Sequence, residues 1–396
     1  MSTQPHVSPE FPHYDPENDE KWWNQLPDWF SSHREQFTID PMNYLKIQAI
    51  SASDYVFRTY ASMAVVLSNA RMFAKLLDKE HRDQWEFYRQ EQFFDEPNTF
   101  FKPPEKHYVR RYKAEMPALP NAVIEDLTFD SGFVPNHPRF SEVSHHVFPA
   151  PEGRARFIQH GDKPRPTIIC MHGFVVDSYE LNSWVFDIKR LYELGLDVLM
   201  YTMPFHGPRQ GSTSRFSGDG FFTIDVASIN ESMAHSIHDL RVYIDYLQQE
   251  RHVPKVGMSG VSLGAYHTAL MASIDERIEF AIAKVPILSI IDVVLEWEPV
   301  GTFFKTLMKL NDVKVQDVRH LMGVHSPLSH KPLCPKENLF IIAGLGDRMA
   351  SPKQARLLWE HWRRPKLYWY PGNHMIHLER EKYLDEVEQF LRDRVL

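Results

Sequence analysis

Short runs of apolar residues alternate with helical patterns from about residue 107 to the end of the chain. Uninterrupted apolar runs are typical of strands that are covered on both faces, and strands that alternate with helices predict a mostly parallel sheet. We therefore expect an α/β fold with a mostly parallel central sheet and helices on both faces. Strands are predicted at 145–150, 154–160, 167–172, 196–202, 255–259, 277–285, 338–343 and 366–371, and helices at about 178–194, 224–250, 262–274, 352–363 and 378–394.

The residues before this region follow a different pattern. Residues 1–37 are rich in Pro, acidic and aromatic residues and lack periodicity, so we expect an irregular arm. Residues 38–95 contain a long stretch without Gly or Pro, with apolar residues at helical spacing, which predicts one long helix or a helical pair. The adjacent prolines of "FFKPPEK" (100–106) break this pattern.

The chain is therefore divided into an N-terminal arm and helical subdomain (1–106) and an α/β domain (107–396). Residues 38–95 are expected to pack on the main domain or on a partner subunit, or to cap an active site.

One interval of the α/β domain is too long for a simple connection. Residues 286–337 carry no strand pattern but contain helical fragments, "SIIDVVLEW" and "FFKTLMKLNDV". We expect a helical insertion there, before the next strand and above the carboxyl ends of the strands, where ligands bind in such sheets.

Composition narrows the function. The 396 residues carry a formal net charge of -8, which disfavours a broad nucleic-acid-binding surface. The two cysteines, Cys170 and Cys334, make no disulfide framework. The first residues lack the basic start and apolar run of a signal peptide, and no stretch approaches the roughly 18 apolar residues of a membrane span. We expect a cytoplasmic protein, with homo-oligomerisation left open.

The strongest chemical signal is "GVSLG", residues 260–264, which matches G-x-S-x-G. Only Ser262 is centred between two glycines, because Ser259 has Val261 two residues after it. A strand pattern precedes the motif and a helix pattern follows it, which is the setting of a nucleophile elbow. A tight turn without chemistry is the alternative.

With this motif in its strand–turn–helix setting, the sequence resembles the α/β-hydrolase superfamily. Two segments, "GMSGVSLGAYHTAL" and the stretch from "LFIIAGLGDRMASP" to "PGNH", are similar to the relatives of α/β-hydrolase domain-containing protein 18. The resemblance implies an α/β-hydrolase fold, and an oxyanion loop, a nucleophile, an acid and a histidine in that chain order.

The resemblance assigns each part to residues of this chain. "CMHGFVVDS" (170–178) is similar to the oxyanion turn of lipases and esterases, so the backbone N–H groups of Phe174 and Leu263 would bind the oxyanion. The side chain of His172 would brace this loop or border the pocket.

The acid and the base are assigned in the same way. Asp347, in the loop after a late strand, corresponds to the triad acid, and Asp292 in the insertion is a weaker rival. His374 corresponds to the base, and His377 is a nearby pocket or structural residue. The sequence departs from the superfamily here, since "PGNH" replaces a Gly-Gly-His turn.

Other signals are weaker. His206 and Arg209, in "MPFHGPRQG" after a strand, would line the substrate pocket, or the segment is a connecting loop held by an Arg209 ion pair. "HSIH" (235–238) lacks a third ligand pattern, so no metal site is expected. The chain has no phosphate-binding glycine loop and no dinucleotide fingerprint, and the expected chemistry needs no cofactor.

These signals together predict a serine hydrolase with a Ser-His-Asp triad that cleaves a carboxylic ester or thioester through an acyl-serine intermediate. Its substrate would be a small or lipid-like acyl compound. The alternatives are an amidase, peptidase or C–C bond hydrolase on the same triad, or a non-catalytic ligand-binding protein of the same fold.

Overall fold

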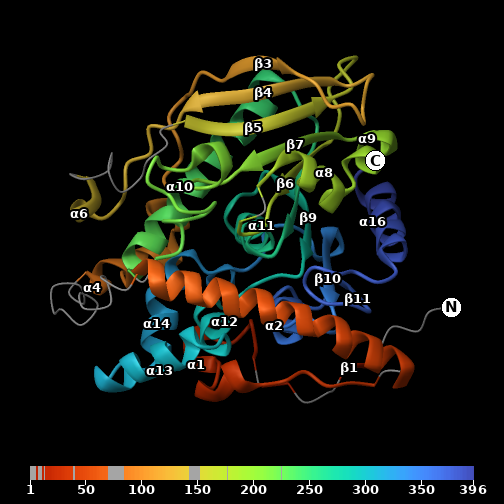
Figure 1. The fold of residues 1–396 in the computed structure, drawn as a ribbon. Coiled ribbons are helices and arrows are strands. Elements are labelled where there is room, and N and C mark those ends of the chain that lie inside the picture. Colours follow the sequence, from red (N-terminus) through yellow and green to blue (C-terminus); the bar gives the residue numbers. More distant parts are fainter. Residues whose placement is uncertain are drawn as a thin grey trace.

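The computed structural model describes residues 6–7, 11–12, 14–38, 41–69, 84–141, 152–175, 177–223 and 225–396. Its centre is a nine-stranded sheet with the order β11-β10-β9-β8-β6-β7-β5-β4-β3 (Figure 1). The strands from β11 to β7 run parallel, whereas β7, β5, β4 and β3 pair antiparallel. The expected mostly parallel sheet is therefore confirmed. The strands are Arg110–Ala114 (β3), Val123–Asp130 (β4), Glu152–Gln159 (β5), Thr167–Met171 (β6), Asp197–Thr202 (β7), Val256–Val261 (β8), Ile278–Lys284 (β9), Leu339–Gly344 (β10) and Lys366–Tyr370 (β11).

Helices cover both faces of the sheet, as expected. In β6, Ile168 and Cys170 face a core shared with α8, α9 and α16, whereas Ile169 and Met171 face the core under α10 and α11. This alternation explains why the strand reads as an uninterrupted apolar run. The helices are Tyr179–Phe186 (α8), Ile188–Leu194 (α9), Val226–Asp245 (α10), Leu263–Ile274 (α11), Pro352–His361 (α15) and Arg380–Arg394 (α16).

Two of the predicted elements differ from the structure or lie outside it. The single helix expected at 178–194 is divided into α8 and α9, because Asp187 adopts a left-handed conformation (φ 52°) between them. The strand expected at 145–150 lies outside the described residues.

The strands β3 and β4 were not predicted from the sequence. β3 is an edge strand of largely exposed, charged residues, "RRYKA", which resembles a loop in composition. Charged edge strands are one way in which proteins prevent edge-to-edge association. Because β3 is charged and exposed, the pattern of apolar residues gives no signal for it.

The insertion between β9 and β10 is helical, as predicted. It contains Ile290–Glu296 (α12), Val300–Leu310 (α13) and Val315–Leu321 (α14), followed by short 3₁₀ turns. α14 packs against the N-terminal helix Trp22–Gln25 (α1), whose side chains Trp22 and Trp23 are buried.

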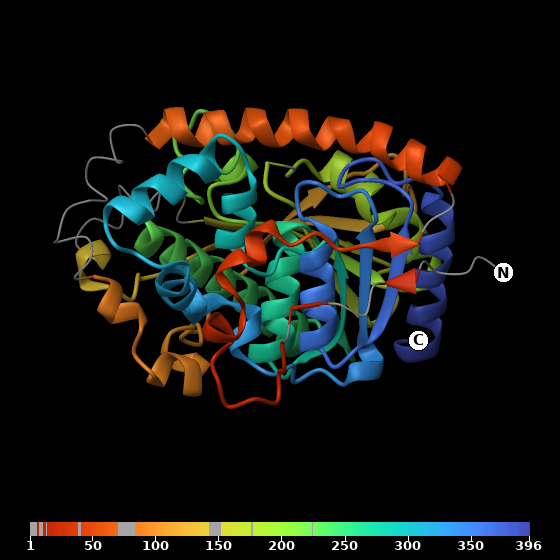
Figure 2. The same ribbon diagram turned by 90° about the horizontal axis from the view of Figure 1, so that it is seen from below.

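The N-terminal extension is dominated by one long helix, Pro41–Asn69 (α2). Figure 2 shows it running along one side of the molecule, beside α13. A two-stranded sheet of His6–Val7 (β1) and Phe37–Thr38 (β2) lies before α2, and the short helices Trp85–Tyr88 (α4), Gln92–Asp95 (α5) and Pro138–Ser141 (α6) follow it. Within the described ranges, no helix is both long and apolar enough to cross a bilayer.

Candidate active site

Ser262 stands at the junction between β8 and α11 in a strained backbone conformation. Its φ is 56° and its ψ is -114°, outside the regions that residues with a side chain normally occupy. Such a conformation costs about 1–3 kcal/mol and persists only where the surroundings enforce it. The hydrogen bond from the Ser262 N–H to the Lys284 carbonyl oxygen (2.9 Å) helps to fix the turn.

The two glycines of the motif are required by close backbone contacts. A methyl group on Gly260 would overlap the carbonyl group of Gly264 across the turn. A methyl group on Gly264 would overlap the carbonyl oxygens of Met171 and His172, at the end of the neighbouring strand β6. The G-x-S-x-G pattern is thus explained by the turn itself and by the approach of α11 to β6.

The loop after β6 lies directly beside Ser262. A Cβ atom on Gly173 would be 3.6 Å from the Ser262 Cβ atom. Leu263 is the first residue of α11, so its N–H has no acceptor within the helix. Phe174 follows Gly173 in the same loop and is half-buried.

His172 braces this loop from inside. Its Nε2 atom accepts a hydrogen bond from the Met203 N–H (3.0 Å), and its Nδ1 atom donates to the Gly173 carbonyl oxygen (2.8 Å). Burial lowers the pKa of His172 to about 4, so the ring is neutral at physiological pH.

Asp347 and His374 are brought together from the loops after β10 and β11. The His374 Nδ1 atom lies 2.7 Å from Asp347 Oδ2. Asp347 is buried, and its Oδ1 atom accepts hydrogen bonds from the N–H groups of Met349 and Ala350, both at 2.8 Å. The carboxylate is therefore fixed on one side by the backbone and directed at the imidazole on the other.

The charges around His374 favour its protonated form. Burial alone would lower the pKa of the imidazole, but the charge and hydrogen bond of Asp347 and the charge of Asp54 outweigh it and raise the pKa above its usual value. An imidazolium that forms at this position is thus electrostatically stabilised.

Ser262 is related to the Asp347–His374 pair by its place in the sheet and not by a hydrogen bond. Among the hydrogen bonds of the described residues, none connects the Ser262 hydroxyl with His374. All three residues nevertheless follow the carboxyl ends of parallel strands, β8, β10 and β11, at the same edge of the sheet.

Asn373 explains the departure of "PGNH" from a glycine-rich turn. Its side-chain oxygen accepts hydrogen bonds from the N–H groups of Met375 (3.0 Å) and Ile376 (2.6 Å). Its side-chain amide donates to the carbonyl oxygen of Ile50 (2.8 Å) and to Ser53 Oγ (2.7 Å) in α2. The asparagine therefore closes the loop that carries His374 and attaches it to the N-terminal helix.

His377 supports the same loop from the other side. Its Nε2 atom donates to the carbonyl oxygen of His374 (3.2 Å), and its Nδ1 atom lies 2.8 Å from the Tyr383 hydroxyl group. Burial lowers the pKa of His377 to about 4. Its ring lies against Tyr370 and Tyr383, in the core beside α16.

His206 and Arg209 are both fully buried. His206 lies beside the rings of His172 and Phe174, near the loop that follows β6. Arg209 forms an ion pair with Asp239 of α10 and donates to the Thr202 carbonyl oxygen (3.0 Å), which holds the connecting loop.

The rival acid Asp292 is engaged elsewhere. It forms a buried two-point ion pair with Arg319 of α14, with N–O distances of 2.7 and 3.0 Å. Arg319 also donates to the Leu26 carbonyl oxygen (2.6 Å), so this pair fastens the insertion to the N-terminal arm.

The helix α2 contributes to this site in a way that was not predicted from the sequence. Asp54 is fully buried, and its Oδ2 atom accepts hydrogen bonds from the N–H groups of Arg348 (2.9 Å) and His374 (3.1 Å). Polar residues at helical spacing, Ser51, Asp54 and Arg58, were visible in the sequence. Nothing in the sequence indicated that they face the rest of the protein.

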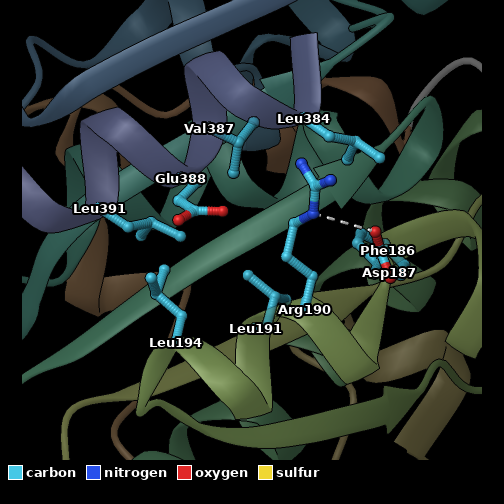
Figure 3. A pocket seen from close by; sticks show the side chains of 9 residues that line it. All are labelled: Phe186, Asp187, Arg190, Leu191, Leu194, Leu384, Val387, Glu388 and Leu391. Carbon is cyan, nitrogen blue, oxygen red and sulfur yellow. Dashed lines mark ion pairs between the residues drawn. The ribbon is translucent and has the colours of Figure 1, made fainter. Parts of the chain in front are cut away.

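One small cavity lies away from these residues. It sits between α9 and α16, on the opposite face of the sheet from α11, and has room for about one water molecule (Figure 3). Arg190 and Asp187 form an ion pair at its edge, with an N–O distance of 3.5 Å. In the part of the chain that the structure describes, no cluster of His, Cys, Asp or Glu side chains could hold a metal ion.

Comparison with known sequences places the chain in a family. No protein-family model matches it. Over 313 residues it is 30% identical to Rv2627c, an uncharacterized protein of Mycobacterium tuberculosis (strain ATCC 25618 / H37Rv), and the match covers 78% of this chain and 73% of that protein. The chain therefore belongs to the same family as Rv2627c.

Comparison with solved structures identifies the fold. Acetyl xylan esterase 1 from Thermoanaerobacterium sp. JW/SL YS485 has a TM-score of 0.54 at 16% identity, over 79% of this chain and 94% of that chain. Acetyl xylan esterase from Paenibacillus sp. R4 has a TM-score of 0.53 at 14% identity, over 78% and 98%. The fold is that of the α/β-hydrolase superfamily.

Proposed function

We propose that this protein is a serine hydrolase that cleaves a carboxylic ester or thioester, with Ser262 as nucleophile, His374 as base and Asp347 as triad acid. The observation that carries the proposal is the strained backbone of Ser262 at the start of α11, at the same sheet edge as the Asp347–His374 pair. Strained residues of this kind concentrate at functional sites.

The roles follow from the chemistry of the three groups. A neutral serine hydroxyl is a weak nucleophile, so His374 Nε2 would accept its proton during attack on the acyl carbon and return it to the leaving group. Hydrogen bonds of this kind are often long in the free enzyme and shorten when substrate binds. Asp347, on Nδ1, would hold the imidazole tautomer and stabilise the imidazolium.

The acyl-serine would form while the oxyanion is held by backbone groups. In this proposal the donors are the N–H groups of Leu263, directly after Ser262, and of Phe174, in the loop beside it, at the positive N-terminal end of α11. Removal of one such donor typically reduces kcat by about 10²–10³-fold. Water would then hydrolyse the acyl-serine by the same steps.

The surroundings favour an apolar acyl group. The aromatic rings of Phe216 and Phe222 pack against Phe174 of the oxyanion loop. Met375 and Ile376, directly after the base, are exposed apolar side chains. Both solved structures described above are named as esterases, and we therefore favour an ester or thioester over an amide or C–C bond.

A fluorophosphonate probe tests the proposal directly, because it reacts with a serine hydroxyl that is activated as a nucleophile. The wild-type protein should be labelled and should hydrolyse p-nitrophenyl acetate, butyrate or octanoate. Ser262→Ala should lose both reactions, whereas Ser259→Ala, in the preceding strand, should keep them.

An unlabelled wild-type protein that leaves all three esters intact would favour the non-catalytic alternative. Labelling without ester hydrolysis would direct attention to amide or C–C substrates on the same triad.

A further inference from the structure

The buried face of α2 is polar. Over residues 42–63, the buried side chains of this helix are Ile47, Ser51, Asp54, Arg58 and Ser62. Helices on a protein surface normally bury an apolar stripe, and buried polar groups are costly unless they find partners. Three of these polar side chains, Ser51, Asp54 and Arg58, find hydrogen-bond partners in the rest of the protein.

Its partners are the loops that carry the proposed acid and base. Ser51 Oγ donates to the carbonyl oxygen of Gly346 (2.6 Å), next to Asp347. The Arg58 guanidinium donates to the carbonyl oxygen of Arg348 (3.0 Å), on the other side of Asp347. α2 thus forms hydrogen bonds with the residues immediately before and after Asp347, the proposed acid.

Asp54 connects the two loops. A single carboxylate oxygen, Oδ2, accepts the backbone N–H of Arg348 and the backbone N–H of His374. Since these residues follow different strands, β10 and β11, the carboxylate fixes the acid and the base relative to each other.

Asp54 also contributes charge to the site. Asp347 and His374 face Asp54 from the two loops. The charge of Asp54 also acts on Tyr370 of β11. Arg58 lies one turn further along α2. Burial and the charge of Asp347 raise the pKa of Asp54 to about 6. Above that pH its negative charge stabilises the His374 imidazolium.

We propose that Asp54 is a positioning residue of the active site, which holds the Asp347 and His374 loops together from the N-terminal helix. The inference rests on the proposed function, and it makes α2 a working part of the hydrolase.

Two substitutions separate the hydrogen bonds from the charge. Asp54→Asn retains an oxygen that can accept both N–H groups, so it should keep most of kcat. Asp54→Ala removes the acceptor and should lower kcat by about 100-fold with little change in KM, as expected for displaced reacting groups. Thr59→Ala, on the exposed side of the same helix, should match the wild type.

The pH profile of kcat/KM gives a second test, because a residue with only a structural role would not change it. Because the negative charge of Asp54 raises the pKa of His374, Asp54→Asn should shift the acidic limb of kcat/KM to lower pH. The base would then be active at a lower pH than in the wild type.

The outcomes are distinguishable. If wild-type protein reacts with the fluorophosphonate and Asp54→Ala reacts equally fast, the positioning role is wrong and the hydrolase remains. Folded Asn and Ala variants with equal losses and an unchanged acidic limb would also overturn it. A wild-type protein without labelling would overturn both proposals.

The exposed face of α2 carries a second, independent observation. Leu45, Val56 and Tyr60 are 64%, 73% and 75% exposed, and the exposed Ala49 and Ala52 lie between them. We call these five residues the outer stripe. Their spacing of three and four residues places them along one side of the helix, as in the seam between two paired helices.

The charges on α2 indicate what covers the outer stripe. The helix contains three charged residues, Lys46, Asp54 and Arg58, and the last two are buried. With Lys46 alone exposed, the face lacks the several basic residues that attract a helix to anionic lipid. A surface almost without charge can meet an identical surface without repulsion.

The outer stripe is also complementary to the same stripe on a second copy of the protein. In an antiparallel pair centred near Ala52, Leu45 lies opposite Tyr60 and the small Ala49 lies opposite Val56. The two Lys46 side chains are then separated by about 20 Å along the axis, beyond the screening length of about 8 Å at physiological salt. A two-fold axis makes such a contact closed and self-complementary.

We infer that the outer stripe is a dimer interface, with α2 of one protomer packed antiparallel on α2 of a second copy. This contact leaves the inner face of each α2 on its own active site.

Sedimentation velocity on the full chain tests this interface. The wild type should be a dimer at micromolar concentration, and Val56→Asp should be a monomer. Leu333→Asp, at a residue that is 55% exposed outside α2, should remain dimeric. A wild type that is monomeric at 100 µM, or a dimer that survives Val56→Asp, would overturn the inference, as would a monomeric wild type that floats with phosphatidylcholine vesicles.

Discussion

The turn that carries Ser262 and the pair of Asp347 and His374 lie at one edge of one sheet, but they are built in different ways. The turn around Ser262 is complete within a strand, two glycines and the start of a helix, with β6 as its neighbour. Asp347 and His374 lie on two loops whose backbone is hydrogen-bonded to α2, a helix that precedes them by about 300 residues. Asp54 and His374, for example, are 320 residues apart in the chain.

The difference shows two ways of holding a reactive group in place. A strained turn needs close backbone packing, which glycine permits and any side chain prevents. A pair of side chains on loops needs hydrogen-bond partners for the loop backbone, and these come from wherever the fold supplies them. We therefore expect substitutions at the Ser262 turn to act through steric overlap. Substitutions around Asp347 and His374 should act by removing hydrogen bonds that hold the two loops in place.

The largest expected effect concerns the two histidines of the base loop. His374→Ala should lower kcat by up to about 10⁶-fold, because an unassisted serine is a weak nucleophile. His377→Ala should retain much of the activity, since it removes only a support of the loop. Hydrolysis of p-nitrophenyl esters measures both, and the reverse ranking would exchange the two assignments.

The next largest effect separates the acid from its rival. Asp347→Asn should reduce kcat by about 10⁴-fold, because an amide no longer holds the imidazole in the required tautomer. Asp292→Asn should leave kcat nearly unchanged and lower the free energy of unfolding by about 3–5 kcal/mol, since it breaks the buried pair with Arg319. Kinetics and urea unfolding on the same samples distinguish the two. An inactive Asp292 variant of normal stability would contradict our choice of acid.

A third change breaks the turn by steric overlap. Gly264→Ala should destabilise the protein by about 3 kcal/mol and abolish labelling of Ser262, because the new methyl group meets the end of β6. Ala265→Gly, one residue further, should cost only about 1 kcal/mol of helix stability. Equal stabilities of the two variants would show that α11 does not approach β6 as closely as described.

The smallest effect tests the loosening of the base loop. Asn373→Ala removes the hydrogen bonds to Ile50 and Ser53 and should lower kcat by about 10-fold, with a loss of about 1–3 kcal/mol of stability. Asn338→Ala removes a comparable bond, to the Glu279 carbonyl oxygen, at the opposite end of β10. It should lower stability alone. If both variants keep full kcat, attachment to α2 is not what positions His374.

Much of the fold was predictable because its signals are local. The apolar runs of β6 to β11 and the helices of the insertion follow from burial on both faces and from helical spacing. β3 escaped prediction because an exposed edge strand carries no apolar pattern. The break at Asp187 escaped it because a single left-handed residue leaves the helical spacing on either side intact.

The candidate site divides along the same line. The sequence by itself determined the strand–turn–helix around Ser262, because strand, glycines and helix are adjacent in the chain and their sterics are local. The resemblance to the α/β-hydrolase superfamily also indicated Asp347 and His374, through their order after late strands. Only the tertiary structure decided that α2 presents Asp54 to both loops, because a polar stripe on a helix does not reveal which way it faces. That direction is set by the hydrogen bonds that the buried loop backbone requires, and these connect residues at opposite ends of the chain.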